Sequence, residues 1–164
     1  MKRKQILKLL VAFALLGCSN SDDGKKEQIY LGEILFDFSL QDPSGTDLLD
    51  PNVEGSFNTD EIALYEKVDG TYILFDQPLS AHPKGYTIDE WEGLYYFTPY
   101  YFDAKAASHD LKIEWGNGKT DFILVTCEDG DGNWKNANEI TYNGNLVWNM
   151  ELNPEDKIFT IVVE

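Results

Sequence analysis

Apolar and polar side chains alternate along most of the chain between residues 33 and 164, and a repeat of two residues predicts β-strands rather than helices. In the segment 33–40, Ile34, Phe36 and Phe38 alternate with their neighbours as in a half-buried strand. The segment 122–127 is apolar at nearly every position, which is typical of a central strand covered on both faces. Further strands are predicted at 61–66, 71–76, 111–115, 140–142, 146–148 and 158–163.

Turn sequences separate these predicted strands. Residues 67–70, 116–119 and 143–145 combine glycine with Asp, Asn or Lys, which favours the backbone conformations of tight turns. Glycine or proline interrupts nearly every long segment that could form a helix, so only 47–50 and 103–108 could supply short helical turns. The fold class predicted for residues 29–164 is all-β: a single antiparallel β-sandwich, immunoglobulin-like, with eight to nine strands.

The N-terminus has the organisation of a secretory signal peptide. Residues 1–8 include four basic side chains, and residues 9–16 form an unbroken apolar run. Such a run, if helical, spans about 12 Å, which is too short for the ~30 Å hydrocarbon core of a membrane. We therefore predict a signal peptide over residues 1–17 rather than a transmembrane anchor.

Residues Leu15-Leu16-Gly17-Cys18 resemble the lipobox of bacterial lipoproteins. The resemblance implies that the sulfur of Cys18 accepts a diacylglycerol, that fatty acids such as palmitate anchor the chain, and that the mature protein begins at this residue. Residues 18–28 then form the lipidated cysteine and a flexible tether, since 19–28 contain no apolar side chain. The alternative is an ordinary signal peptide with an incidental cysteine.

Acidic residues in the tether bear on the location of the domain. Ser21-Asp22-Asp23 resembles the acidic stretch that directs lipoproteins of the Bacteroidetes to the cell surface. The resemblance implies a lipid-anchored protein of the outer membrane whose domain faces outward. The alternative is that these acids only keep the linker soluble.

The charge balance excludes one class of partner. The chain has 29 acidic and 13 basic residues. Because residues 1–17 carry four of the bases and no acid, the remainder has 9 bases against 29 acids, a net charge of −20. A surface this acidic repels phosphate, so the sequence predicts no nucleic-acid binding. Two cysteines, Cys18 and Cys127, do not provide a disulfide framework.

Four further motifs resemble small lipoproteins of the Bacteroidetes that have no assigned function. They are Asp47–Pro51, Trp91–Leu94, Ile113–Asp121 and Tyr142–Asn145. These motifs consist of turn and strand residues rather than catalytic groups. The resemblance spans about residues 36–163 and implies the β-sandwich and the envelope location, but it names no ligand and no functional residue.

No catalytic constellation stands out in the sequence. It contains neither Gly-x-Ser-x-Gly nor His-Glu-x-x-His, and Cys127 lies in an apolar segment typical of a buried, inert thiol. Asp89, Glu90 and Glu92 could supply the paired carboxylates of a glycoside hydrolase. In a chain this acidic some close pair arises by chance, so we predict that the protein is not an enzyme.

A glycine-rich acidic loop is the candidate metal site. Asp129, Asp131 and Asn133 place oxygen-bearing side chains at alternate positions, as in short loops that bind calcium. The match to an EF-hand loop fails at its sixth and twelfth positions, which are Trp134 and Ile140. Asp, Asn and Gly also favour tight turns for conformational reasons alone. A structural turn is the preferred interpretation, with calcium as the alternative and no other cofactor expected.

Aromatic side chains are concentrated between residues 91 and 102. Neighbouring residues of a strand point to opposite faces, so these side chains cannot all be buried together. Exposed aromatic groups are a usual platform for sugars or protein partners, and the candidate ligand-binding residues are Trp91, Tyr95, Tyr100 and Tyr101. The alternative is that loops cover the second face and create a second small core.

Together these features predict a membrane-anchored envelope lipoprotein that acts as a cell-surface binding module for glycan or protein. The alternative is a structural or accessory lipoprotein that assembles with another envelope protein and binds no small ligand. An exposed aromatic row on one sheet favours the first function, whereas a bare apolar sheet edge favours the second.

Overall fold

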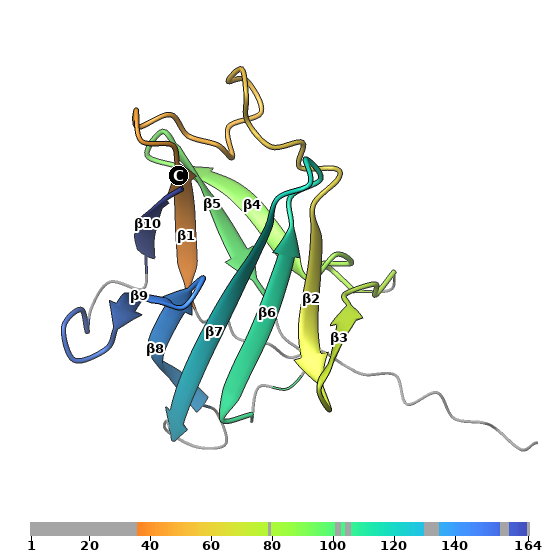
Figure 1. Ribbon diagram of the computed structural model, residues 1–164, viewed down its shortest axis with the longest axis vertical. Coiled ribbons are helices and arrows are strands. Elements are labelled where there is room, and N and C mark those ends of the chain that lie inside the picture. Colours follow the sequence, from red (N-terminus) through yellow and green to blue (C-terminus); the bar gives the residue numbers. More distant parts are fainter. Residues whose placement is uncertain are drawn as a thin grey trace, which may run out of the picture.

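A computed structural model describes residues 36–78, 80–100, 103, 106–129, 135–154 and 158–163 (Figure 1). Over this part of the chain every regular element is a β-strand and none is a helix. The strands are β1 (Asp37–Gln41), β2 (Ala63–Val68), β3 (Thr71–Leu74), β4 (Tyr86–Trp91), β5 (Leu94–Pro99), β6 (Ser108–Glu114), β7 (Thr120–Asp129), β8 (Lys135–Tyr142), β9 (Asn145–Asn149) and β10 (Ile158–Val162). The all-β prediction is confirmed, with ten strands in place of the eight to nine expected.

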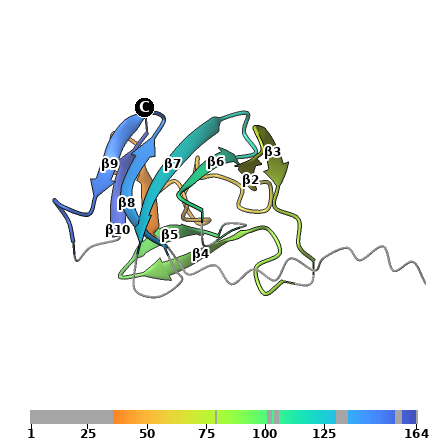
Figure 2. The same cartoon turned by 90° about the horizontal axis from the view of Figure 1, so that it is seen from below.

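The strands form two sheets that lie as two layers. One sheet has four strands in the order β10-β1-β5-β4, and the other has six in the order β3-β2-β6-β7-β8-β9. In Figure 1, β4 and β5 of the four-stranded sheet lie behind β6 and β7, and β1 and β10 lie to the left of β7; Figure 2 shows the same layers from below. The arrangement is that of a β-sandwich-like fold.

The sequence predicts wholly antiparallel sheets, and this prediction is wrong for one pair of neighbouring strands. β1 and β10 pair in parallel, from Asp37 opposite Ile158 to Gln41 opposite Val162. Parallel neighbours require a long connection, and here it consists of all the strands from β2 to β9. A repeat of two residues specifies the face that each side chain takes but not the direction of the neighbouring strand, which is why this feature was missed.

The hairpin of β4 and β5 supplies strands that the alternation pattern did not delimit. Its turn consists of Glu92 and Gly93, with φ of 51° and 83°, so the chain reverses in two residues as in the favoured hairpin turns. The segment 47–50, a candidate helical turn, contains no helix. Its first residue, Asp47, forms an isolated bridge with Gln41 instead.

The core lies between the two sheets and is rich in aromatic rings. Phe38 of β1 lies 6.3 Å from Tyr142 of β8, and Phe97 of β5 lies 5.5 Å from Trp115, measured between ring centroids. Trp115 also stacks on Phe57, with centroids 4.9 Å apart. Side chains from both sheets therefore share one hydrophobic core, which stabilises the two layers as a unit.

The buried carboxylate of Asp121 forms hydrogen bonds with side chains from two of the sequence motifs, 113–121 and 142–145. Asp121, 2% exposed, accepts hydrogen bonds from Nε1 of Trp115 at 2.6 Å, from the hydroxyl of Tyr142 and from Nδ2 of Asn143 at 2.7 Å. Asn143 in turn accepts the backbone N–H of Phe122 at 2.9 Å. The motifs 113–121 and 142–145 thus meet in space, and their polar residues position the turns at one end of the six-stranded sheet.

A second polar pair lies inside the core. Nδ1 of His109 on β6 is 2.7 Å from Oε1 of Glu66 on β2, and both side chains are buried. Each occupies an inward position of its strand, next to Leu64 and Leu111 respectively. Burial of ionisable groups is costly unless they are paired, so this contact is a structural requirement of the core.

Candidate functional site

The side of the four-stranded sheet that faces away from the core carries an aromatic surface. Tyr86, Ile88 and Phe97 pack in the core, so the alternate positions of β4 and β5 face outward. The outward positions of the four strands are Thr87, Asp89 and Trp91 in β4, Leu94, Tyr96 and Thr98 in β5, Asp37, Ser39 and Gln41 in β1, and Ile158, Thr160 and Val162 in β10. Ser39 and Thr98 in the middle of this face are buried, whereas Asp89 and Trp91 on the β4 side and Ile158 and Val162 on the β10 side are exposed.

Trp91 and Tyr96 form a ring pair on this side. Their centroids are 6.1 Å apart and the rings are tilted by 51°. The pairing follows from the two-residue turn, because Trp91 lies opposite Leu94 and Tyr96 is its diagonal neighbour on the same face. Trp91 is 54% exposed, an unusual exposure for a side chain of this size. This pair is the centre of the candidate site, and we call it the Trp91–Tyr96 pair.

Tyr100 extends the aromatic surface beyond the end of β5. Its ring stacks on His82 with centroids 4.3 Å apart, and its backbone N–H donates to the carbonyl of Gly85 at 2.7 Å. Burial raises the pKa of the Tyr100 phenol, and a hydrogen bond with the hydroxyl of Thr87 opposes that rise. Tyr100 is therefore held beside β4 by the stacking of its ring on His82 and by the hydrogen bond of its hydroxyl with Thr87.

Carboxylates surround these rings. Burial raises the pKa of the Tyr96 phenol, and the charges of Glu92, Asp47 and Asp37 raise it further. The charges of Asp89 and Asp37 act in the same direction on the pKa of Tyr100. Oδ1 of Asp37 also accepts the hydroxyl of Thr98 at 2.5 Å. The surface thus combines aromatic faces with negatively charged hydrogen-bond acceptors.

The structure brings together some of the predicted ligand-binding residues and separates others. Trp91 and Tyr100 both lie on the outward surface. Tyr95 does not, because it packs against the core, and its backbone N–H donates to Asp47 at 2.8 Å. Tyr101 lies outside the described residues. Tyr96 was missed as a site residue, although the Glu92–Gly93 turn and strand alternation together place it on the same face as Trp91.

The candidate calcium loop lies at the end of β7. That strand ends at Asp129, and Asp131 and Asn133 lie outside the described residues. Within the ranges that the structure does describe, no group of three or more His, Cys, Asp or Glu side chains is arranged to hold a metal ion. A structural turn therefore stays the prediction for this loop, with calcium binding as its alternative.

The candidate catalytic groups do not converge. Burial raises the pKa of the Cys127 thiol to about 11, so it is protonated at neutral pH and a poor nucleophile. Asp89 and Glu90 are neighbours in β4 and point to opposite faces of the sheet, so they do not form the carboxylate pair of a glycoside hydrolase. Glu92 lies in the turn that follows.

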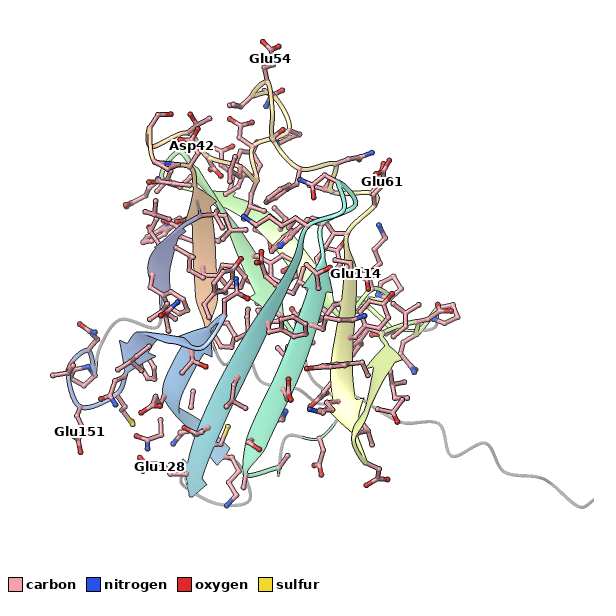
Figure 3. The ribbon with its side chains drawn as sticks, in the orientation of Figure 1. Asp42, Glu54, Glu61, Glu114, Glu128 and Glu151 are labelled. Carbon is pink, nitrogen blue, oxygen red and sulfur yellow. The ribbon has the colours of Figure 1, made fainter. Side chains whose placement is uncertain are left out.

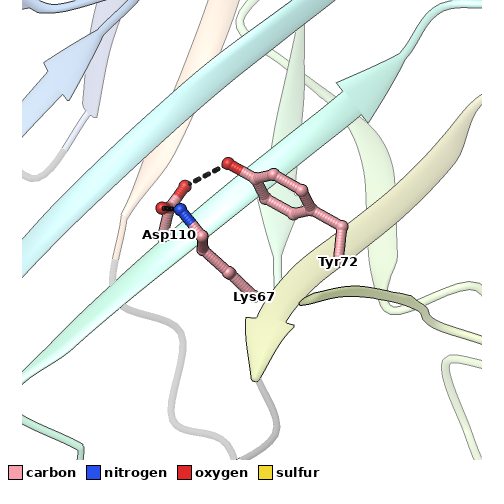
Figure 4. A network of polar contacts seen from close by, with 3 residues as sticks. All are labelled: Lys67, Tyr72 and Asp110. Carbon is pink, nitrogen blue, oxygen red and sulfur yellow. Dashed lines mark hydrogen bonds and ion pairs between the residues drawn. The ribbon is translucent and has the colours of Figure 1, made fainter. Parts of the chain in front are cut away.

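The outer face of the six-stranded sheet carries polar contacts over β2, β3 and β6. Asp110 accepts the ammonium of Lys67 at 3.0 Å and the hydroxyl of Tyr72 at 2.6 Å (Figure 4). Burial, together with Asp110, raises the pKa of Tyr72 to about 12.

A matching contact lies beside it. Glu114, labelled in Figure 3, accepts the ammonium of Lys112 at 2.6 Å and the hydroxyl of Tyr65 at 3.0 Å. The ammonium of Lys112 lies 3.7 Å from the centroid of the Tyr65 ring. Lys67 and Lys112 are therefore each paired with a carboxylate on this face.

Comparison with known proteins finds no family model, no curated protein and no solved structure that matches the chain. Among the described residues no helix is long and apolar enough to cross a membrane.

Proposed function

We propose that this protein is a lipid-anchored envelope lipoprotein whose β-domain binds a glycan through the accessible β4 side of the four-stranded sheet. The observation that carries the proposal is the Trp91–Tyr96 pair, with Trp91 exposed, Tyr96 half-buried and carboxylates on the same surface. Tryptophan and tyrosine offer flat apolar area with a polar edge, which suits the C–H face of a sugar ring. Asp89 is an exposed acceptor for the hydroxyls at the rim of such a ring.

The composition of this surface favours a glycan over a protein. The centre of a protein interface is a desolvated apolar patch that is depleted of charged residues. Here Trp91 is flanked by the exposed carboxylates Asp89 and Glu92, and Thr87 adds a hydroxyl. Polar groups that surround one or two rings are typical of small-ligand recognition, in which apolar area supplies contact and polar atoms supply orientation. The rings also lie on a strand rather than a free loop, which limits the entropy lost on binding.

The anchoring part of the proposal rests on Cys18. Its lipobox-like context and the polar segment 19–28 support a diacylated N-terminus in the outer membrane, with the domain at the cell surface. One acyl chain attaches a protein only marginally, whereas two or more anchor it stably. The acidic domain then needs no lipid-binding surface of its own. The likeness to small lipoproteins of the Bacteroidetes belongs to this proposal as well.

The immunoglobulin-like assignment is also a proposal. Two facing sheets support it. The consecutive hairpins of β6, β7, β8 and β9 within one sheet differ from the Greek-key connections of that fold.

A second function is favoured by a separate observation. Phe122, Leu124 and Leu146 are each more than 40% exposed on the outer face of the six-stranded sheet. At the edge of this sheet β3 is a strand of four residues with Leu74 exposed. Exposed apolar side chains and a free strand edge suit assembly with another envelope protein. This is the accessory lipoprotein alternative.

Trp91→Ala should weaken glycan binding at least tenfold, about 1.4 kcal/mol, because it removes most of the exposed ring area. A glycan array screened with the purified protein identifies the ligand, and titration of the variant measures the loss. Since Trp91 is more than half exposed, its removal should change stability by only about 0.5 kcal/mol.

Phe122→Ala is the matched control, because it removes an exposed aromatic ring from the opposite sheet. It should leave glycan binding unchanged. If no arrayed glycan binds, or if Trp91→Ala binds as the parent does, the glycan proposal is wrong. A pull-down from envelope extract in which only Phe122→Ala loses its partner would establish the accessory function instead.

Cys18→Ser should abolish incorporation of labelled palmitate and release the protein from the membrane fraction, because the acylated sulfur is lost. Cys127→Ser is the control and should leave labelling unchanged, since that cysteine lies within the domain. Palmitate uptake by Cys18→Ser would contradict the anchor. Protease treatment of intact cells then reports whether the domain is outside, since only an exposed domain is digested.

A further inference from the structure

The two outer faces of the molecule differ in how their charges are balanced. On the six-stranded sheet Lys67 pairs with Asp110 and Lys112 pairs with Glu114. On the four-stranded sheet, the outward positions of the described strands include the carboxylates Asp37 and Asp89 but no lysine or arginine. The aromatic surface thus lies in a region of negative potential with no lysine at an outward position of its described strands, whereas two carboxylates of the other face are neutralised by lysines.

One carboxylate is placed to act on a ligand that contacts the rings. Asp89 lies directly opposite Tyr96 in the β4–β5 ladder and two positions before Trp91 on the same face. Opposed residues have Cβ atoms about 5 Å apart, and positions two apart on a strand are separated by about 7 Å. A group seated on the Trp91–Tyr96 pair is therefore within reach of the Asp89 carboxylate. Asp89 is also exposed, so it can meet a ligand without moving other side chains.

The tyrosines of this surface show the same electrostatic influence. Burial is the largest cause that raises the pKa of Tyr96, and the charges of nearby carboxylates are the next largest. The charges of Asp89 and Asp37 also raise the pKa of Tyr100. Ionisation of either phenol would place another negative charge in this field. A ligand carboxylate, sulfate or phosphate would meet the same repulsion, whereas a cation would be attracted.

This inference rests on the proposed function and names the class of its ligand. We propose that the Trp91–Tyr96 pair binds a glycan with free amino groups, that is, with hexosamine units that are not N-acetylated. One sugar ring stacks on Trp91, and its ammonium lies within reach of the Asp89 carboxylate and the Tyr96 ring. An ammonium gains from both partners, because it is attracted to an aromatic face and forms charge-assisted hydrogen bonds with a carboxylate.

The choice of an amino sugar follows from the aromatic rings and the carboxylates of the site taken together. An aromatic ring alone would accept any pyranose with a flat C–H face. The surrounding carboxylates reject glycans that contain uronic acids or sulfate, because like charges brought together in a partly desolvated site repel. Among neutral and basic sugars, only the free amine turns the Asp89 contact into an ion pair. The Asp89 charge is thus the specificity determinant, and Trp91 supplies contact area.

Three oligosaccharides of equal length test the proposal with the full-length protein. They are a glucosamine tetramer, the fully N-acetylated tetramer and a galacturonate tetramer. We expect the glucosamine tetramer to bind about tenfold more tightly than the acetylated one, and the galacturonate not to bind. A tenfold difference corresponds to about 1.4 kcal/mol, which is what a charge-assisted hydrogen bond adds over a neutral one.

Asp89→Asn keeps the shape of the side chain and removes its charge. It should weaken glucosamine binding about tenfold and leave binding of the acetylated tetramer unchanged. Glu128→Gln is the control, because it removes one charge from an exposed position of β7 in the other sheet (Figure 3). Its effect on glucosamine binding should stay within about twofold, since separated surface charges are screened by salt.

The outcomes separate this inference from the proposed function. Equal or tighter binding of the acetylated tetramer that is lost in Trp91→Ala would overturn the amine preference and leave the glycan site intact. Equal losses in Asp89→Asn and Glu128→Gln would show general charge attraction and overturn the inference. If none of the tetramers and no arrayed glycan binds, the proposed function fails and the inference fails with it.

Discussion

Asp121→Ala is expected to lower the free energy of unfolding by about 3–5 kcal/mol. The substitution removes an acceptor shared by Trp115, Tyr142 and Asn143. The donors on Trp115 and Tyr142 are buried, and each buried donor left without an acceptor costs about 1–3 kcal/mol. Urea denaturation of the variant and the parent measures the difference. Asp121→Asn should give an intermediate loss, because it retains one side-chain oxygen.

Asp110→Ala is the matched control for this prediction. Asp110 also accepts hydrogen bonds from two side chains, Lys67 and Tyr72, but it lies on the outer face with a third of its side chain exposed. Water can replace its contacts, so its removal should cost no more than about 1 kcal/mol. Equal losses for Asp121→Ala and Asp110→Ala would mean that the buried network does not stabilise the fold as its geometry suggests.

The positions of most strands could be predicted because alternation is a local property. Segments such as 111–115 and 122–127 carry their pattern within a few residues. Pairing could not be predicted in the same way. The hydroxyls of Ser39 and Thr160, 2.8 Å apart across β1 and β10, are 121 residues apart in the sequence. No local pattern reports such a contact, which depends on how the whole domain packs.

The buried polar groups left a signal in the sequence that alternation makes visible. His109 has the same parity as the buried Leu111 and Ile113, and Asp121 has the same parity as the buried Ile123 and Val125. Continuing each apolar row by two residues places these ionisable groups inside the core. Their partners could not be inferred, because Glu66 and Tyr142 come from other parts of the chain.

The candidate site could be predicted in part for the same reason. The aromatic segment was recognised from composition, and Trp91 and Tyr100 lie on the outward surface. Which tyrosine accompanies Trp91 depends on the position of the turn. Because Glu92 and Gly93 form a two-residue turn, Tyr96 shares the face of Trp91 and Tyr95 takes the other side. A turn shifted by one residue would exchange the two tyrosines.

Glu66→Leu and His109→Leu are each expected to lower the free energy of unfolding by about 3–5 kcal/mol. Nδ1 of His109 and Oε1 of Glu66 are 2.7 Å apart in the core, and removing one partner withdraws a buried polar contact from the other. The double substitution should cost much less than the sum of the two. With both polar groups replaced by leucine, the free-energy cost of burying polar groups is removed and the core gains apolar contacts.

A double-mutant cycle measured by urea denaturation provides the test. Lys112 and Glu114 supply the control pair, because their 2.6 Å contact lies on the outer face, where a salt bridge contributes about 0–1 kcal/mol. Their cycle should therefore give a coupling near zero, whereas that of Glu66 and His109 should be large. If the Glu66 and His109 losses are simply additive, each side chain contributes through packing alone. The buried contact would then have no energetic role, and the strict inward placement of two ionisable groups in this core would need another cause.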